Sequence, residues 1–88
     1  MDKQYMFYHD PGHGWLRVLK TEIEPIKDKI SHYSYMNGKY VYLEEDSDAA
    51  IFLRHKFGNI FDAKSYIKEK YVENTAIRNY VSYSAEAI

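Results

Sequence analysis

Asn37 and Gly38 separate two short runs in which tyrosine alternates with other residues, and this pattern constrains the fold most strongly. Asn-Gly between strand-like runs indicates a β-hairpin with a two-residue type I′ loop. A loop at 37–38 makes residue 36 face 39 and residue 33 face 42. Because side chains alternate across a strand, the tyrosines share one face. The two predicted faces are Tyr33, Tyr35, Tyr40 and Tyr42 on one side, and Ser34, Met36, Val41 and Leu43 on the other.

A second hairpin is predicted around the turn at 10–13, where Pro11 and Gly12 occupy positions that turns favour. Strand-prone runs at 4–9 and 14–19 flank it, so His9 should face Gly14. This register separates an apolar face from a mixed one. The predicted core face carries Tyr5, Phe7, Leu16 and Val18, and the other carries Met6, Tyr8, Trp15 and Arg17.

Two helices are predicted between and after these hairpins. Thr21 to Glu24 matches a capping box, and Ile23, Ile26 and Ile30 follow at helical spacing, with Pro25 making the helix short or partly 3₁₀. The second helix is better defined. Four acids within 44–48 precede apolar residues at helical spacing over 49–57, and Gly58 is placed to end the helix.

The segment Ser65–Glu73 fits a strand by alternation and a helix by its spacing of Ala63, Ile67 and Tyr71. We favour a strand, because its Tyr-Ile and Tyr-Val pairs suit a half-buried sheet. The predicted fold is therefore a single α+β domain over residues 1–88. It has a small antiparallel sheet of two hairpins plus a fifth strand, packed by two helices.

Composition narrows the function classes. A net charge of −1 over 88 residues excludes a strongly basic nucleic-acid binder and a uniformly acidic DNA mimic. The absence of cysteine excludes disulfides, thiolate zinc sites and a cysteine nucleophile. The start of the chain is polar, and no stretch approaches the roughly 20 apolar residues of a membrane span. We expect a cytoplasmic protein without membrane contact.

His9, Asp10 and His13 form the tightest cluster of ligand-capable side chains. The favoured interpretation is a capped turn with solvated histidines, because no established metal motif is present. Two alternatives stay open: a metal-dependent enzyme built on these three residues, and a small-ligand or nucleotide site. In the second, Gly12 and Gly14 would let a ligand approach backbone amides. No metal or cofactor is predicted.

The tyrosine-rich hairpin has three interpretations. Aromatic faces stack nucleobases, tyrosine-rich patches mark protein interfaces, and a helix covering the tyrosines would make them core. The hairpins bring only Arg17 and Lys39 near these rings, and the acids at 44–48 lie next to them. Nucleic acid is therefore disfavoured as a direct ligand. The acids themselves either cap the following helix or imitate phosphates toward a basic partner.

Segments 7–16, 28–35, 42–49 and 76–80 resemble a group of small, functionally uncharacterised proteins encoded by bacteriophages, plasmids and other mobile elements of bacteria. The resemblance covers nearly the whole chain and carries no established activity. It implies a cysteine where Ser47 stands, so a thiol role is not expected there. Small proteins of that origin often antagonise host defence, as anti-CRISPR and anti-restriction proteins do, by binding and blocking a protein.

These observations predict a non-enzymatic protein that inhibits a bacterial defence system by binding a host protein. That host protein would be a component of defence or of nucleic-acid processing. The aromatic and acidic side chains would form the surface, with Trp15 and Tyr8 exposed. The predicted partner-binding residues are Tyr8, Trp15, Tyr33, Tyr35, Tyr40, Tyr42, Glu44, Glu45, Asp46 and Asp48. The alternative ligand site would use His9, Asp10, Gly12, His13 and Gly14.

Overall fold

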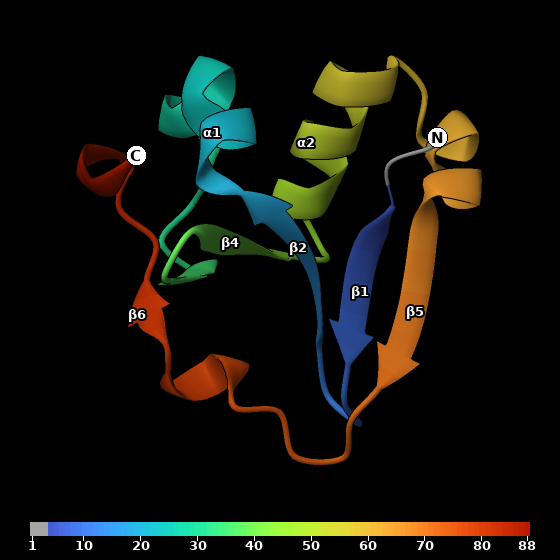
Figure 1. Ribbon diagram of the computed structural model, residues 1–88, viewed down its shortest axis with the longest axis vertical. Helices are drawn as coiled ribbons and strands as arrows, with labels where there is room; N and C mark the ends of the chain where they lie inside the picture. The colour runs from blue at the N-terminus through green and yellow to red at the C-terminus, as the bar shows by residue number, and fades with distance from the viewer. Residues whose placement is uncertain (1–3) are drawn as a thin grey trace.

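Six strands form one mixed sheet in the computed structural model, which describes residues 4–88 (Figure 1). Their order across the sheet is β5-β1-β2-β4-β3-β6, which confirms the predicted α+β class. The strands are β1 Tyr5–His9, β2 Gly14–Leu19, β3 Tyr35–Asn37, β4 Tyr40–Glu44, β5 Ile67–Tyr71 and β6 Val81–Ser82. The helices and 3₁₀ turns are α1 Lys20–Ile23, η1 Glu24–Lys29, α2 Asp48–Phe57, α3 Ile60–Ala63, η2 Lys64–Tyr66, η3 Ile77–Asn79 and η4 Ala85–Ala87.

The first hairpin has the predicted register. Phe7 lies opposite Leu16 and His9 opposite Gly14, so the loop is residues 10–13. Tyr5, Leu16 and Val18 are buried on the core face, as their alternation predicted.

The second hairpin differs from its prediction by one loop position. Asn37 pairs with Tyr40 and Tyr35 with Tyr42, so the two loop residues are Gly38 and Lys39. Gly38 has a φ of 61° and Lys39 has no positive φ, which fits a type II′ turn and not type I′. The physical reason is that glycine tolerates positive φ at the first loop position while Asn37 continues the strand. Each residue therefore faces a partner two positions away from the predicted one. Because side chains alternate with a period of two, every strand side chain keeps its predicted face.

The fifth strand is confirmed, but it pairs with β1 in parallel and makes the sheet mixed. Tyr5 lies beside Ile67, and Tyr8 beside Lys70. The chain reaches this position through α2, α3 and η2, which form the crossover that a parallel pair requires. A sixth strand, which the sequence analysis did not predict, pairs with β3 at the opposite edge, with Val81 beside Met36.

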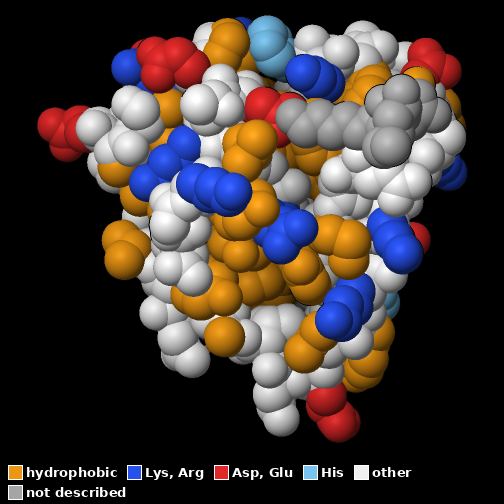
Figure 2. Space-filling model, in the orientation of Figure 1, with side chains coloured by type: hydrophobic (Ala, Val, Ile, Leu, Met, Phe, Trp, Pro, Cys, Tyr) orange, Lys and Arg blue, Asp and Glu red, His pale blue; other side chains and the backbone are white. Residues whose placement is uncertain are grey.

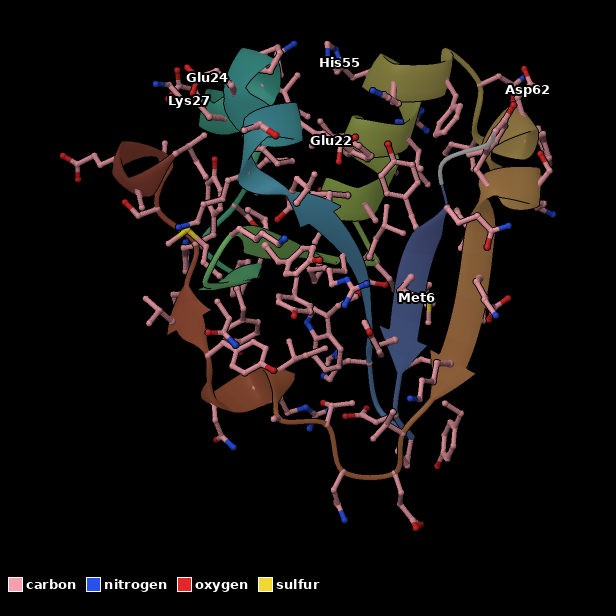
Figure 3. All side chains as sticks on the ribbon, viewed as in Figure 1. Met6, Glu22, Glu24, Lys27, His55 and Asp62 are labelled. Atoms are coloured by element: carbon pink, nitrogen blue, oxygen red, sulfur yellow. The ribbon has the colours of Figure 1, made fainter. Side chains whose placement is uncertain are left out.

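The helices pack on the sheet face opposite Tyr8, Tyr40 and Tyr42. Phe52 of α2 is fully buried there, and its ring meets Tyr5 edge-on with centroids 5.6 Å apart. Glu22 projects from α1 toward α2 (Figure 3), and its carboxylate accepts a 2.6 Å hydrogen bond from the Tyr5 hydroxyl. Gly58 ends α2 as predicted, with a φ of 76° and its N–H bonded to the Arg54 carbonyl at 2.8 Å. The buried residues of this core are Tyr5, Leu16, Val18, Ile23, Ile26, Ile30, Met36, Val41, Leu43, Ala49, Phe52, Leu53, Ala63 and Tyr83.

The start of the first helix corrects the predicted capping box. α1 begins one residue before Thr21, and Leu19 occupies the N-cap position. Glu22, three residues after Leu19, accepts a 3.3 Å hydrogen bond from the Leu19 N–H, so Glu22 and not Glu24 has the reciprocal role. The following turns are 3₁₀ with Pro25 near their start, as the sequence indicated.

Asp48 fixes the N-terminus of α2 to the rest of the sheet. One carboxylate oxygen accepts hydrogen bonds from the Ser31 N–H at 3.1 Å, the Ser31 hydroxyl at 2.7 Å and the Ser34 hydroxyl at 2.6 Å. The Ser34 hydroxyl in turn accepts from the Glu44 N–H at 2.9 Å. Asp48 is only 1% exposed, so its predicted place on a partner-binding surface is wrong. Its carboxylate satisfies buried donors instead.

Asp48→Ala should lower the free energy of unfolding by about 3 kcal/mol, because the donors of Ser31 and Ser34 lose a charged acceptor. Urea unfolding of the variant measures this loss. The matched control is Asp46→Ala, which removes an exposed carboxylate two residues away and should change stability by less than about 0.5 kcal/mol. Equal losses in the two variants would contradict the assigned role.

Gly14→Ala should destabilise the fold by about 1–3 kcal/mol, because the Phe7 ring packs over the glycine. An added Cβ would overlap Phe7 Cζ and lie 2.8 Å from Cε2. Gly12→Ala is the comparison, since its Cβ would lie 3.2 Å from Arg78 Nη2, a tight contact without overlap, and it should cost less than Gly14→Ala. Urea midpoints compare the two, and adding Phe7→Leu to Gly14→Ala should restore part of the loss. If Gly12→Ala costs as much, the overlap is not the cause.

Candidate functional site

The sheet face opposite the helices, here called the tyrosine face, carries a second cluster of aromatic residues. Its strand residues are Tyr8, Trp15, Arg17, Tyr35, Tyr40 and Tyr42. Over residues 4–88, no long helix covers this face. Residues 72–80, which we call the C-terminal arm, run from β5 to β6 (Figure 1) and pack Ile77 and Tyr80 against the tyrosines. The rings of Tyr42 and Tyr80 lie 5.1 Å apart. The tyrosine face is therefore partly core and partly surface.

This cover corrects the expected exposure of several predicted partner-binding residues. Trp15 is 3% exposed and Tyr42 7%, so neither offers an open ring. Tyr8, Tyr35 and Tyr40 are partly exposed. Tyr33 precedes β3 and is 67% exposed. The alternation of residues along the strand places Trp15 on the face away from the main core and therefore predicts that it is exposed. No local pattern indicates that the C-terminal arm returns over this face.

Arg17 is a half-buried residue of the tyrosine face, where it lies between Met6 of β1 and Tyr42 of β4. Its guanidinium carbon is 4.4 Å from the centroid of the Tyr40 ring and 5.6 Å from that of Tyr8. Such cation–π contacts hold a planar guanidinium in place without neutralising its charge. Within residues 4–88, no carboxylate forms an ion pair with Arg17. This side chain is held in position and keeps its charge available.

Three lysines lie on or beside the same face as this arginine. The parallel register sets Lys68 beside Met6 and Lys70 beside Tyr8, and both lysines are exposed. Lys39 Nζ lies 5.6 Å from the Tyr40 centroid. With Arg17 these lysines form what we call the basic rim, and none of the four pairs with a carboxylate in the described part of the chain. Figure 2 shows basic side chains gathered around a hydrophobic patch, with acidic ones toward the edges of the view.

Sequence reasoning missed the two lysines of β5. Lys68 and Lys70 are two residues apart, which indicates a shared strand face. Only the parallel pairing with β1 shows that this face is the one that carries the tyrosines.

Asp10 fastens the C-terminal arm to the β1–β2 turn. One carboxylate oxygen accepts from the backbone of Gly12 and His13, each at 2.9 Å, and from Arg78 Nη2 at 2.8 Å. The other accepts from the Thr75 hydroxyl at 3.3 Å. Burial acts to raise the pKa of Asp10, but these hydrogen bonds and the Arg78 charge outweigh it and hold the pKa below its usual value.

The structure does not bring His9, Asp10 and His13 together as ligands. The His9 ring lies 5.3 Å from the Tyr71 ring on the helix side, whereas the His13 ring lies 6.0 Å from Trp15 on the tyrosine side. Among residues 4–88, no group of three His, Cys, Asp or Glu side chains is placed to hold a metal ion. Gly12 and Gly14 have no positive φ, so the turn is not the left-handed nest that the ligand alternative would use.

The acidic run divides among three environments. Asp48 belongs to the scaffold, and Glu45 lines a groove on the helix side. Glu44 and Asp46 border a cavity of about 410 Å³, which we call the acidic pocket. Burial, followed by the charges of neighbouring acids, raises the pKa of Glu44 against the opposing hydrogen bond from the Asp46 N–H. The pocket is lined by His13, Trp15, Tyr33, Tyr35, Glu44, Asp46 and Arg78.

Comparison with protein-family models, with curated proteins and with solved structures finds no match to this chain. Over residues 4–88, no helix has the length and apolar character needed to cross a membrane.

Acid titration should reveal how much the hydrogen bonds and the ion pair of Asp10, here called the Asp10 clamp, stabilise the fold. A carboxyl whose pKa is lowered on folding stabilises the fold above its unfolded value of about 3.9, and this stabilisation is lost as pH falls through the folded pKa. Asp10→Asn should therefore be less stable than wild type at neutral pH, and the difference should shrink below about pH 4. Thermal melting across pH measures this. Asp62→Asn, an exposed control, should follow the wild-type profile; a constant deficit for Asp10→Asn would contradict the clamp.

Proposed function

We propose that the protein is a non-enzymatic binding protein whose tyrosine face and basic rim cover an acidic surface of a partner protein. The observation that carries this proposal is Arg17, held between two tyrosine rings without a carboxylate partner in the described chain. Arginine and tyrosine dominate the energetics of protein interfaces. The lysines of the basic rim add a charge that attracts acidic partners.

The packing of the rings favours a protein over a nucleic acid. Tyr40 and Tyr42 meet at an interplanar angle of 61°, and Tyr8 and Tyr42 at 47°. Arg17 lies over the rings of Tyr8 and Tyr40. Arg17 therefore occupies a face of each of these two rings, whereas a nucleobase needs an open aromatic face for stacking.

The biological setting of the proposal comes from the resemblance to proteins of phages and mobile elements. In that setting the partner is a component of bacterial defence, and the protein is an inhibitor of the anti-CRISPR or anti-restriction kind. Occupying an acidic surface of such a component would block it by steric exclusion, without any reaction.

The test begins with a photo-crosslinking residue at position 68, with the same residue at position 29 on η1 as the reference. The protein captured only from position 68 is identified, purified and titrated by calorimetry. Lys68→Glu with Lys70→Glu should weaken its affinity at least about tenfold, and Arg17→Glu about a hundredfold. Both losses should shrink at high salt.

Lys29→Glu reverses an exposed charge on the helix side and should leave affinity within about twofold. Equal weakening by Lys29→Glu would contradict the assigned surface. Tighter binding of a single-stranded oligonucleotide than of any captured protein would replace the proposal with nucleic-acid binding. Thermal melting of each variant separates loss of binding from loss of folding.

A further inference from the structure

We propose that the acidic pocket binds an organic cation, a guanidinium or alkylammonium group, in a site separate from the basic rim. The pocket lies where Trp15 of β2, Tyr35 of β3 and Glu44 of β4 meet beside the C-terminal arm. Its volume of about 410 Å³ lies within the range of ligand sites. Nothing in the proposed function requires this site.

Aromatic rings supply the first part of the recognition. Trp15 is almost completely buried, and its ring meets that of Tyr35 at 68° with centroids 6.5 Å apart. Tyr33 adds a ring that is 67% exposed at the opening. Because Trp15 is covered, the rings available to an organic cation are those of Tyr33 and Tyr35, and aromatic rings of this kind bind organic cations.

The protein already places one cation against these rings. The Arg78 guanidinium carbon is 5.5 Å from the Trp15 centroid. Its charge is balanced by Asp10, with 2.8 Å between Nη2 and Oδ1. Arg78 therefore occupies one part of the pocket wall without neutralising the acids on the other part.

Carboxylates supply the second part. Glu44 and Asp46 both line the cavity, and within residues 4–88 no Lys, Arg or His forms an ion pair with either. One Glu44 oxygen accepts the Asp46 N–H, which keeps the two carboxylates close together. Two neighbouring unneutralised acids repel an anion and attract a cation. Burial and the neighbouring acids raise the pKa of Glu44, as expected for a carboxyl that has no cationic partner.

The chain carries a built-in probe for this site. Trp15 is the only tryptophan, so emission excited where tyrosine does not absorb reports on the pocket. We would titrate ethylguanidinium and tetramethylammonium, with sodium chloride at matched ionic strength as the reference. At least one cation should produce a saturable change with a Kd on the order of millimolar.

Glu44→Gln combined with Asp46→Asn should weaken that binding at least about tenfold, and Tyr33→Ala, at the exposed opening, should weaken it without affecting folding. The control is Asp28→Asn, an exposed acid on η1 outside the pocket, which should bind as wild type does. No saturable change with either cation, or equal affinity in the Glu44/Asp46 double variant, would overturn the proposal.

Two further arms distinguish the source of the cation and the dependence on the basic rim. A capped glycine peptide with one central arginine should bind more tightly than ethylguanidinium if a partner side chain is the ligand, and no more tightly if a free small cation is. The variant Lys68→Glu with Lys70→Glu should keep full cation binding. Loss of cation binding in this variant would show that the fluorescence change does not report a site separate from the basic rim.

Discussion

The Asp10 carboxylate is the contact on which the arrangement of the tyrosine side depends. It closes the β1–β2 turn through two backbone amides and, with the same oxygen, receives Arg78 from 68 residues further along the chain. The C-terminal arm is thereby held where Ile77 and Tyr80 reach the tyrosines. A local turn contact and a long-range tether thus share one carboxylate, which links the β1–β2 turn to the C-terminal arm beside the second cluster.

This tether explains how so short a chain buries part of the second face of its sheet. A domain of this size usually has one core, and here the helices cover one face in that way. The other face is covered by irregular chain, whose backbone groups need partners of their own. The 3₁₀ turn η3 supplies some of them, and Tyr83 extends the arrangement by donating its N–H to the Ser34 carbonyl at 2.8 Å and its hydroxyl to the Lys27 carbonyl at 2.6 Å. Through these two hydrogen bonds, Tyr83 links the segment that follows β6 to the helix side of the sheet.

Local periodicity predicted much of this fold, and it failed where partners are distant in sequence. The faces of both hairpins and the ends of α2 follow from alternation, helical spacing and a terminal glycine. The parallel partner of β5 and the return of the arm over Trp15 follow from no local pattern. Asp48 shows the same limit, since an acid at a helix start is ordinary, and only the folded chain reveals the two serines that bury it.

The same limit affects the interpretation of charge. A net charge of −1 excludes a strong overall field, yet it says nothing about how the charges are distributed. Two of the four basic-rim side chains come from the parallel edge strand, and the acids of the pocket come from the end of β4 and the loop that follows. Unpaired charges of opposite sign therefore gather at different ends of one face. Since desolvating an unpaired charge without a partner is costly, each group gains most from a ligand of the opposite charge. A chain that is nearly neutral as a whole thus carries two groups of opposite charge on one face, and this segregation, more than the number of tyrosines, is what the folded structure adds to the sequence.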